Sequence, residues 1–461
     1  MDLLELAFFK AKVGGADVAP PVLERLEATE NGVYSPGQGV DGFDRVEVAV
    51  PGPALQQKTA TENGVVVPDS GYDGLSRVTV NVRPVESLPE KAVNLRDYNG
   101  AVLHAYTAEE FAALSALPDN PSREGLIAQG WNWALANAQA YVAKNGALEI
   151  GQMYITDDGK TRVYIRLEEG YTSPMMGLCP NGVVDIDWGD GTAHDTLTGG
   201  STTNVKWTPA HNYEKPGEYV IRISAESGNF AFYGTSAADQ HSGLLRHASA
   251  SSGRNAVYQN AIQRIEIGGG INIISSNALS NCRALKSVTV PRNVIFISDG
   301  AFRDCLALSY LAIPDDVTTV GNYAFQNCAI LARLSIPRKA ASVGNYVFYG
   351  CGSLSRVAIS DGATRINMGL FTNCHCLARL VVPESIGNIG DNVFIGCSGL
   401  AQLQFKGATP PAASASSFSG IPTDCVIIVP SGTLAAYTGA ANYPSSATYT
   451  YVEDSDLTGT A

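Results

Sequence analysis

The chain has 461 residues, of which 16% are charged, and a formal net charge of −13. This length predicts several domains rather than a single core. The acidic balance excludes a general nucleic-acid binder, because phosphate contacts require a basic face, and no apolar run is long enough to insert into a membrane. With 47 glycines, the composition favours short strands and turns, so we expect a multidomain, predominantly β protein.

Residues 1–24 begin with a short amphipathic stretch that ends at Gly14 and Gly15. Its apolar residues are Leu3, Leu4, Leu6, Phe8 and Phe9. The pattern predicts a short helix, which either packs on a neighbouring domain or anchors the chain in a larger assembly. Asp2 and Glu5 stand where a secretory signal has basic residues, so we expect no export signal.

Residues 25–86 contain two copies of a 32-residue repeat. The segments 29–33, 39–43 and 45–48 recur as 61–65, 71–75 and 77–80. Asn-Gly and Asp-Gly steps between alternating apolar residues predict a small β-hairpin in each copy. The pattern resembles modules of phage tail and other virion proteins of gut bacteria, which implies a virion structural role.

Residues 87–150 carry a pattern centred on residues 95–100, on Leu117-Pro118 and on residues 129–131 (Gln-Gly-Trp). This pattern resembles the internalin-type B repeat, although Ala128 stands where that family has an aromatic residue. The resemblance implies an α+β module with a helix over residues 108–117 and Trp131 in its core. A second helix is expected over residues 132–143.

Residues 151–228 contain an alternating strand pattern in which Val184, Ile186 and Trp188 share one face, followed by a Gly-Asp-Gly turn. With residues 211–213 (His-Asn-Tyr) and 216–221, this resembles a polycystic-kidney-disease (PKD)-type domain, which is an immunoglobulin-like β-sandwich. Residues 229–256 are rich in Gly, Ser and His, and we expect them to form a connecting loop.

Residues 257–430 contain a 23-residue repeat, which predicts a solenoid. The repeat is marked by cysteines at 282, 305, 328, 351, 374 and 397, with Phe302, Phe325, Phe348, Phe371 and Phe394 three positions before the last five. We interpret the cysteines as small apolar residues that point inward as reduced thiols, although distance alone does not exclude disulfides between coils.

The repeat and its end, which includes residues 409–411 (Thr-Pro-Pro) and 425–430, resemble the BspA-type leucine-rich repeat of bacterial surface and phage proteins. The resemblance implies a concave face of strands and short helical turns on the convex side. Residues 431–461 are expected to be a C-terminal cap and tail.

Two residue groups have the composition of catalytic or metal sites. Asp185, Asp187 and Asp190 could be paired acids or calcium ligands, but we interpret them as turn formers. Residues 374–376 (Cys-His-Cys) resemble a metal motif, yet Cys374 occupies the inward position of its repeat, which prevents three ligands from converging. There is also no nucleophile motif. We therefore predict no enzyme, no cofactor and no metal.

One outward column of the predicted concave face contains Tyr310, Arg333, Arg356, Arg379 and Gln402. We call this set the arginine column. Its guanidinium groups suit an anionic ligand, so we predict that the column is a ligand-binding surface exposed to solvent. The alternative is a solvated charged face paired with acids such as Asp315, Asp316 or Asp361.

These features together predict a phage virion fibre on the tail or capsid surface, because a virion assembles in the host cytoplasm and needs no export signal. Its N-terminal region would contact other virion proteins, and the solenoid would bind a host-surface glycan or protein. A homotrimer is possible, although no heptads enforce it. The alternative is a bacterial cell-surface adhesin of the BspA-like family.

Overall fold

The computed structural model describes residues 92–98, 100–234, 243–247, 252–340 and 342–454, together with six short strands between residues 26 and 79. The chain divides into two compact units, Met1–Lys91 and Ala92–Ala461. The helix expected over residues 1–24 lies outside the described residues. No helix in the described ranges is both long and apolar enough to cross a membrane.

The first unit contains one antiparallel sheet made by both copies of the 32-residue repeat. The first copy contributes β1 (Leu26–Thr29), β2 (Val33–Pro36) and β3 (Val46–Glu47), and the second contributes β4 (Lys58–Thr61), β5 (Val65–Pro68) and β6 (Val78–Thr79). The order is β3-β2-β1-β4-β5-β6, so the copies join where β1 pairs with β4. Joining gives a six-stranded sheet, whereas one isolated hairpin is only marginally stable.

The second unit begins with an α+β module, residues 92–156, which we call the docking module. Its elements are β7 (Val93–Arg96), β8 (Val102–Tyr106), α1 (Ala108–Ala112), β9 (Leu126–Trp131), α2 (Leu135–Asn145) and β10 (Leu148–Thr156). The strand order is β8-β7-β10-β9. A capping box between Thr107 and Glu110 starts α1. Trp131 is buried, at 5% exposure.

Two predicted boundaries in this region are wrong. Helix α1 ends at Ala112, five residues before the expected end at residue 117. Strand β10 runs through the predicted domain boundary at residue 150, because its first half pairs with β7 and its second half pairs with β9. The docking module therefore ends after Thr156.

The next part of the chain packs strands around a core that contains Ile186 and Trp188. Its strands are β11 (Thr161–Leu167), β12 (Pro174–Asp187), β13 (Asp195–Gly200), β14 (Lys206–Trp207), β15 (Gly217–Ala225), β16 (Asn229–Phe232) and β17 (Leu245–His247). Strand β12 pairs with β17, β14 and β16 along its first part and with β13 and β15 along its second.

The prediction of a connecting loop over residues 229–256 is also wrong. This segment contains β16, β17 and the start of α3 (Ser252–Ala261). Phe230 and Phe232 are fully buried, and β16 and β17 both pair with β12. The Gly- and Ser-rich residues around these short strands conceal their apolar pattern in the sequence.

The solenoid has about 8 turns and two rows of parallel strands. The concave face consists of β18 (Ile262–Glu266), β20 (Ser287–Thr289), β23 (Arg333–Ser335), β25 (Arg356–Ala358), β27 (Arg379–Val382), β29 (Gln402–Phe405), β31 (Val426–Val429) and β32 (Thr450–Glu453). The second row is β19 (Ile273–Ile274), β21 (Phe296–Ile297), β22 (Thr319–Val320), β24 (Ser342–Val343), β26 (Arg365–Ile366), β28 (Asn388–Ile389) and β30 (Ala412–Ala413). The predicted, predominantly β fold with a solenoid is confirmed.

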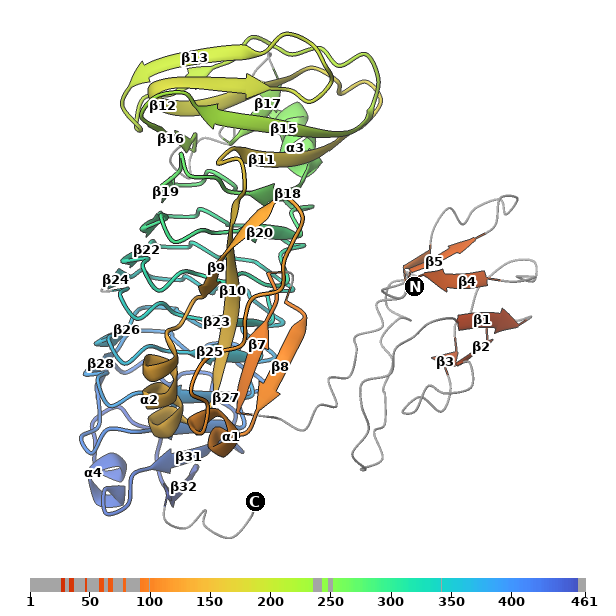
Figure 1. The fold of residues 1–461 in the computed structure, drawn as a ribbon. Coiled ribbons are helices and arrows are strands. Elements are labelled where there is room, and N and C mark those ends of the chain that lie inside the picture. Colours follow the sequence, from red (N-terminus) through yellow and green to blue (C-terminus); the bar gives the residue numbers. More distant parts are fainter. Residues whose placement is uncertain are drawn as a thin grey trace. The chain divides into compact units, whose positions relative to one another are not determined.

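Both ends of the solenoid are continued by other strands. Strand β11 pairs antiparallel with β18, so the sheet of the preceding part continues into the concave face (Figure 1). At the other end, α4 (Leu434–Thr438) leads to β32, which pairs in parallel with β31. The segment expected to be only a cap and tail therefore adds one more strand to the concave face.

The repeat cysteines, which we call the cysteine column, make hydrogen bonds in the core in addition to their apolar packing. Each of Cys305, Cys328, Cys351, Cys374 and Cys397 is buried and donates its thiol to a backbone carbonyl of the preceding coil, at 3.1 to 3.2 Å. Each of these carbonyls also accepts a backbone N–H, so the thiol adds a second hydrogen bond that alanine at this position could not make. All nine cysteines are free thiols in the structure.

Candidate functional site

The arginine column is aligned across the concave face. Tyr310 lies opposite Arg333, Arg333 opposite Arg356, and Arg379 opposite Gln402. Parallel strands with no offset place these side chains on one side of the sheet. The repeat period thus correctly predicts which residues lie next to each other.

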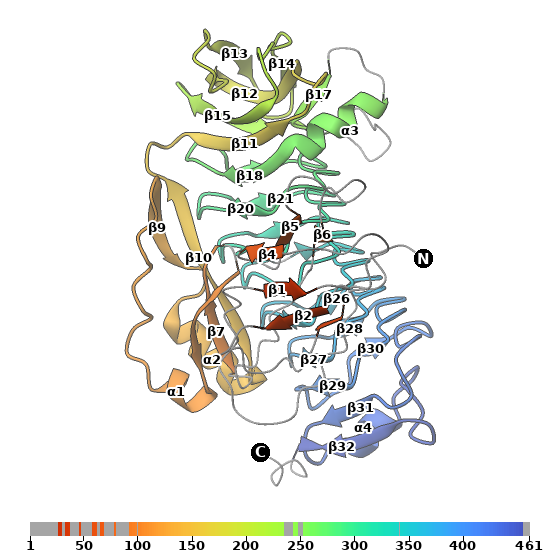
Figure 2. The same ribbon diagram turned by 90° about the vertical axis from the view of Figure 1, so that its right-hand side faces the viewer.

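The docking module covers much of this column. Strand β10 runs beside the concave strands in both views of the ribbon (Figures 1 and 2). The hydroxyl of Ser335 donates to the backbone carbonyl of Glu149 at 2.6 Å. A Cβ atom added to Gly151 would lie 2.3 Å from the Tyr310 hydroxyl and 2.5 Å from the Cβ of Ala312. Strand β10 therefore lies so close to the concave face that position 151 has no room for a side chain.

Tyr310 is consequently only 6% exposed. Its ring lies against Gly100, where an added Cβ would be 2.8 Å from the Tyr310 Cβ. Burial raises the pKa of the Tyr310 hydroxyl above its usual range. The expectation that the column faces solvent is wrong at this residue, because the docking module fills the space in front of it.

The arginines of the column meet a carboxylate that belongs to the same chain. The side chain of Glu149, which is 2% exposed, lies 3.3 Å from Arg356 Nη1 and 3.7 Å from Arg333 Nη1. Within the docking module, Glu149 also pairs with Arg96 at 2.5 Å and accepts a hydrogen bond from Asn94 at 3.0 Å. Charged hydrogen bonds are strong in such a buried setting, but only while both partners remain in place.

Hydrogen bonds from the docking module to solenoid backbone atoms extend the contact. The Tyr141 hydroxyl donates to the carbonyl of Ile359 at 2.8 Å, and the Asn132 amide donates to the carbonyl of Ile313 at 3.2 Å. In the other direction, Arg292 donates to the carbonyl of Gln129 at 2.9 Å. Apolar packing adds to these bonds, because Ala358 of the solenoid belongs to the core cluster of the docking module.

The acids considered as alternative partners of the column have other contacts. Asp361 accepts from the Asn145 amide at 3.1 Å. Asp315 accepts from the backbone N–H of Arg338 at 2.6 Å, and Asp316 pairs with Lys339 at 2.6 Å. Asp361 thus contacts the docking module, whereas Asp315 and Asp316 contact the next coil of the solenoid.

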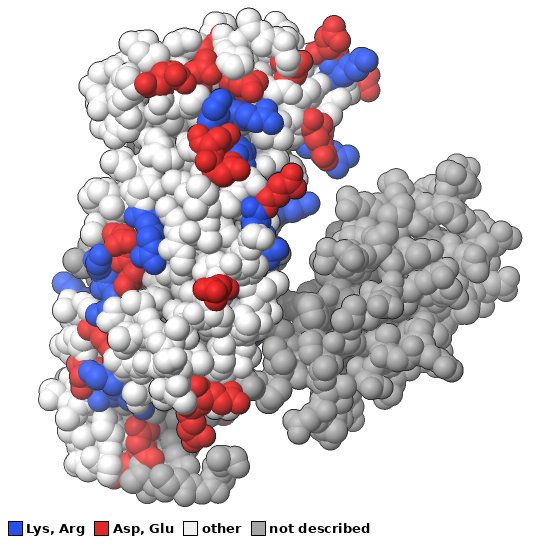
Figure 3. Space-filling model, in the orientation of Figure 1, with Lys and Arg blue, Asp and Glu red and all other residues white. Residues whose placement is uncertain are grey.

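Arg379 and Gln402 are the two members of the column that remain exposed. Arg379 donates to the side chain of Gln404 at 2.7 Å. A ligand-binding role of these two residues stays a prediction. Seen from the side of the docking module, the charged side chains of the second unit form small groups of mixed sign rather than one basic field (Figure 3).

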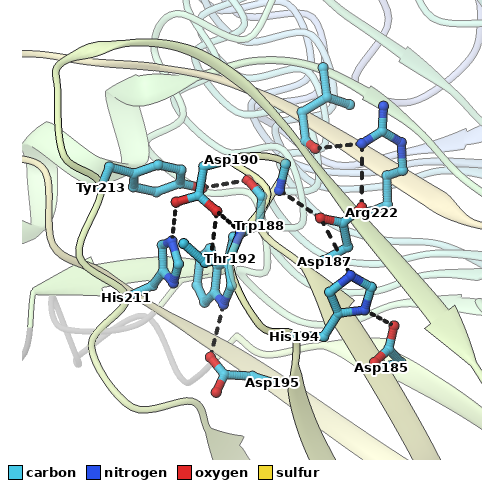
Figure 4. Close-up of polar contacts among 12 residues, drawn as sticks. Asp185, Asp187, Trp188, Asp190, Thr192, His194, Asp195, His211, Tyr213 and Arg222 are labelled. Atoms are coloured by element: carbon cyan, nitrogen blue, oxygen red, sulfur yellow. Dashed lines mark hydrogen bonds and ion pairs between the residues drawn. The ribbon is translucent and has the colours of Figure 1, made fainter.

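The Asp185, Asp187 and Asp190 cluster forms turn and ion-pair contacts (Figure 4). Asp187 accepts from the backbone N–H of Gly189 at 2.8 Å, and Asp190 accepts from the backbone N–H of Thr192 at 3.1 Å. These are the short-range bonds that aspartate makes in tight turns. Asp185 lies 2.8 Å from one ring nitrogen of His194, and Asp187 lies 3.8 Å from the other, whereas Asp190 pairs with His211, so the three carboxylates do not share one centre.

The pair of Asp190 and His211 lies partly buried against Trp188. The two side chains are 2.8 Å apart, and the His211 ring stacks on Trp188 with a centroid distance of 4.6 Å. Burial alone would raise the pKa of Asp190, but hydrogen bonds from Thr192 and His211 outweigh it and lower the pKa. The arrangement holds the Asp190 carboxylate in the turn.

The metal motif considered for residues 374–376 does not assemble. Cys374 is buried in the solenoid, whereas His375 and Cys376 are exposed. Within the described ranges, no three His, Cys, Asp or Glu side chains converge as metal ligands.

Sequence reasoning missed Glu149 and Gly151. A signal was present, since Glu149 lies between Leu148 and Ile150 in a strand whose neighbours are apolar. A charged residue in such a run indicates a buried ion pair. The sequence carries no indication that the partners are arginines about two hundred residues away.

Comparison with known proteins identifies the solenoid. Residues 226–332 and 296–422 match the family described as the BspA type leucine rich repeat region, in 6 copies. Residues 226–422 are thus similar to the BspA-type leucine-rich repeat. The match covers less than half of the chain, so the BspA-type region describes the solenoid and not the docking module. No curated protein shows significant similarity to the chain.

Three of the solved structures with similarity to the chain are of leucine-rich proteins. One from T. pallidum is 25% identical, with 31% of this chain and 66% of that chain covered and a TM-score of 0.29. One from Bacteroides ovatus is 17% identical, with coverages of 48% and 74% and a TM-score of 0.29. A leucine rich cell surface protein from Faecalibacterium prausnitzii is 23% identical, with coverages of 39% and 62% and a TM-score of 0.26. The chain thus spans about two thirds of the length of these proteins.

Proposed function

We propose that this chain is a bacterial cell-surface adhesion protein without catalytic activity. The observation that carries the proposal is the match of residues 226–422 to the BspA-type leucine-rich repeat, a repeat associated with bacterial surface proteins. The solenoid would present a ligand-binding surface to a host glycan or protein.

The contacts within the second unit favour a display role. Arg162 of β11 contacts both the docking module and the solenoid. It donates to the carbonyl of Gly125 in the docking module and lies 3.4 Å from Glu266 of the solenoid. It also pairs with Asp157 at 2.7 Å. The docking module and the sheet of β11 to β15 are thereby fixed to the solenoid. Because the docking module occupies much of the concave face, adhesion would use surfaces that stay open, such as the exposed end at Arg379 and Gln402.

Adhesion and location can be tested together. Antibodies against the second unit should label intact cells of the bacterium that makes the protein, and beads coated with the full chain should adhere to host epithelial cells. Absence of labelling on intact cells, with the protein present in the cell lysate, would reject the surface location.

A phage virion fibre is the second candidate. The observation that favours it is the sheet of two 32-residue repeats, whose sequence resembles modules of virion proteins. In this case the N-terminal region would bind other virion proteins, the PKD-like domain would be a spacer, and the fibre could be a homotrimer. Mass spectrometry of purified particles distinguishes the candidates, because the chain is present in particles only if this second candidate holds.

A further inference from the structure

In the convex turns of the solenoid, two coils carry tyrosine at a repeat position where the other coils carry glycine or asparagine. The fifth residue before each column cysteine has a left-handed backbone, with φ between 55 and 62° in all six coils. These residues are Asn277, Gly300, Tyr323, Tyr346, Gly369 and Asn392. Glycine and asparagine tolerate this conformation, whereas a bulky residue rarely adopts it. Two consecutive coils therefore carry tyrosine against the preference of the backbone.

The two tyrosine rings form a stack at the surface, with Tyr323 exposed and Tyr346 half-buried. Their centroids are 5.4 Å apart and their planes differ by 1°, while Tyr349 meets Tyr346 edge-on at 6.2 Å. Tyr323 is 40% exposed. The coils already have a buried aromatic stack in Phe325 and Phe348, so the core does not require a second one. Strained residues that persist at a surface are typical of functional sites.

The following coil leaves room for this stack. A Cβ atom added to Gly369 would lie 2.2 Å from Cδ1 and Cε1 of Tyr346, so the ring rests where a side chain would otherwise be. The adjacent Met368 is 37% exposed and continues the apolar surface. Any side chain at position 369 would collide with the Tyr346 ring.

Polar groups border the rings. Asn345 is exposed, and its backbone N–H bonds to the Asn322 side chain at 2.8 Å. Within the described ranges, none of the three tyrosine hydroxyls has a hydrogen-bond partner in the protein. The surface thus combines aromatic carbon with amide and hydroxyl groups that both donate and accept hydrogen bonds.

We propose that Tyr323, Tyr346 and Tyr349 form a binding platform for a neutral glycan. A pyranose ring has a C–H face that packs on aromatic side chains and hydroxyls that pair with amides and phenols. An anionic ligand would call for arginine or lysine, and the platform contains neither. This inference rests on the proposed adhesion function and gives it a site and a ligand class.

The test replaces both tyrosines by residues that other coils use at the same position, in the double variant Tyr323→Asn/Tyr346→Gly of the full chain. The probe is an array of immobilised neutral oligosaccharides of glucose, galactose and N-acetylglucosamine. The unaltered chain should bind at least one of them, and the double variant should lose about tenfold or more in affinity. Its thermal midpoint should be unchanged or higher, because the backbone strain is relieved. Ile127→Ser, at a residue 52% exposed on β9, is the matched control and should bind normally.

Two results would overturn the platform. One is undiminished binding by the double variant, and the other is failure of the unaltered chain to bind any of the neutral oligosaccharides. Adhesion of coated beads to host cells separates this failure from failure of the proposed function. If the double variant adheres like the unaltered chain, the adhesion function stands and the platform is rejected; if the unaltered chain does not adhere at all, the adhesion function is rejected.

Discussion

At the residue scale, the docking of the module depends on Glu149. Its buried carboxylate lies among the guanidinium groups of Arg96, Arg333 and Arg356. Three cations around one anion make the carboxylate indispensable, because its loss leaves like charges close together in a buried setting. The anionic partner that the arginine column suggests is thus present inside the chain at two of its three arginines.

We predict that Glu149→Gln lowers the free energy of unfolding of the second unit by about 3–5 kcal/mol, the usual cost of breaking a buried ion pair. Glu384→Gln is the control, since Glu384 forms an exposed pair with Lys144 and should change stability by less than about 1 kcal/mol. Urea unfolding of the full chain, followed by tryptophan fluorescence, measures both. Equal effects of the two substitutions would contradict the role of Glu149.

The cysteine column predicts sensitivity to alkaline pH. Burial raises the pKa of Cys282, Cys351 and Cys397 to about 12 from a usual value of 9.0. An unfolded chain loses these protons near pH 9 while the folded chain keeps them. The contribution of these thiols to stability is therefore fully present below pH 9 and is lost as the pH rises from 9 towards 12.

Comparison with Cys351→Ala isolates this effect from other groups that titrate in the same range. At pH 7 the variant should be less stable, because it lacks the thiol bond to the carbonyl of Phe325. Between pH 9 and 11 its stability should fall less steeply than that of the unaltered chain, by about 1.4 kcal/mol per pH unit. Urea midpoints at several pH values give the two slopes, and identical slopes would show that the thiol is not buried as described.

At the element scale, β10 lies on the concave face only because Gly151 has no side chain. We predict that Gly151→Ala destabilises the second unit by about 1–3 kcal/mol, the range for overpacking. Tyr310→Phe in the same chain should recover part of the loss, since the Tyr310 hydroxyl is the atom nearest to the added methyl group. Gly200→Ala is the control, because Gly200 is also in a strand and an added Cβ would meet nothing within 4 Å. Differential scanning calorimetry compares the three variants, and equal midpoints for the two alanine variants would contradict the close approach of β10.

The elements that repeat or alternate were predictable from sequence, and those that depend on distant partners were not. The fixed spacing of Cys, Phe and Leu determines the coil register, so the alignment of Arg333 with Arg356 follows from the period alone. In contrast, nothing in a 23-residue period indicates that β10 covers those arginines. The sequence did not predict strands β16 and β17, because their apolar runs are short and lie within a Gly- and Ser-rich segment.

At the scale of the whole second unit, three parts of different sequence character share sheets and ion pairs. Strand β11 extends the concave face through β18, and the docking module occupies that face between Tyr310 and Ala358. The docking module thus leaves the end of the concave face at Arg379 and Gln402 and the convex turns exposed. In the proposed adhesion function, these would be the binding surfaces.

The most direct test of this account is a double-mutant cycle between Glu149→Gln and Arg356→Gln, measured by urea unfolding of the full chain. Docking through this ion pair predicts that the two effects are not additive, with a coupling energy of about 1–3 kcal/mol. The same cycle with Arg379→Gln, at an exposed residue whose side chain bonds to Gln404 instead, should be additive within about 0.5 kcal/mol. Additive effects of Glu149→Gln and Arg356→Gln would contradict the docking of residues 92–156 on the concave face.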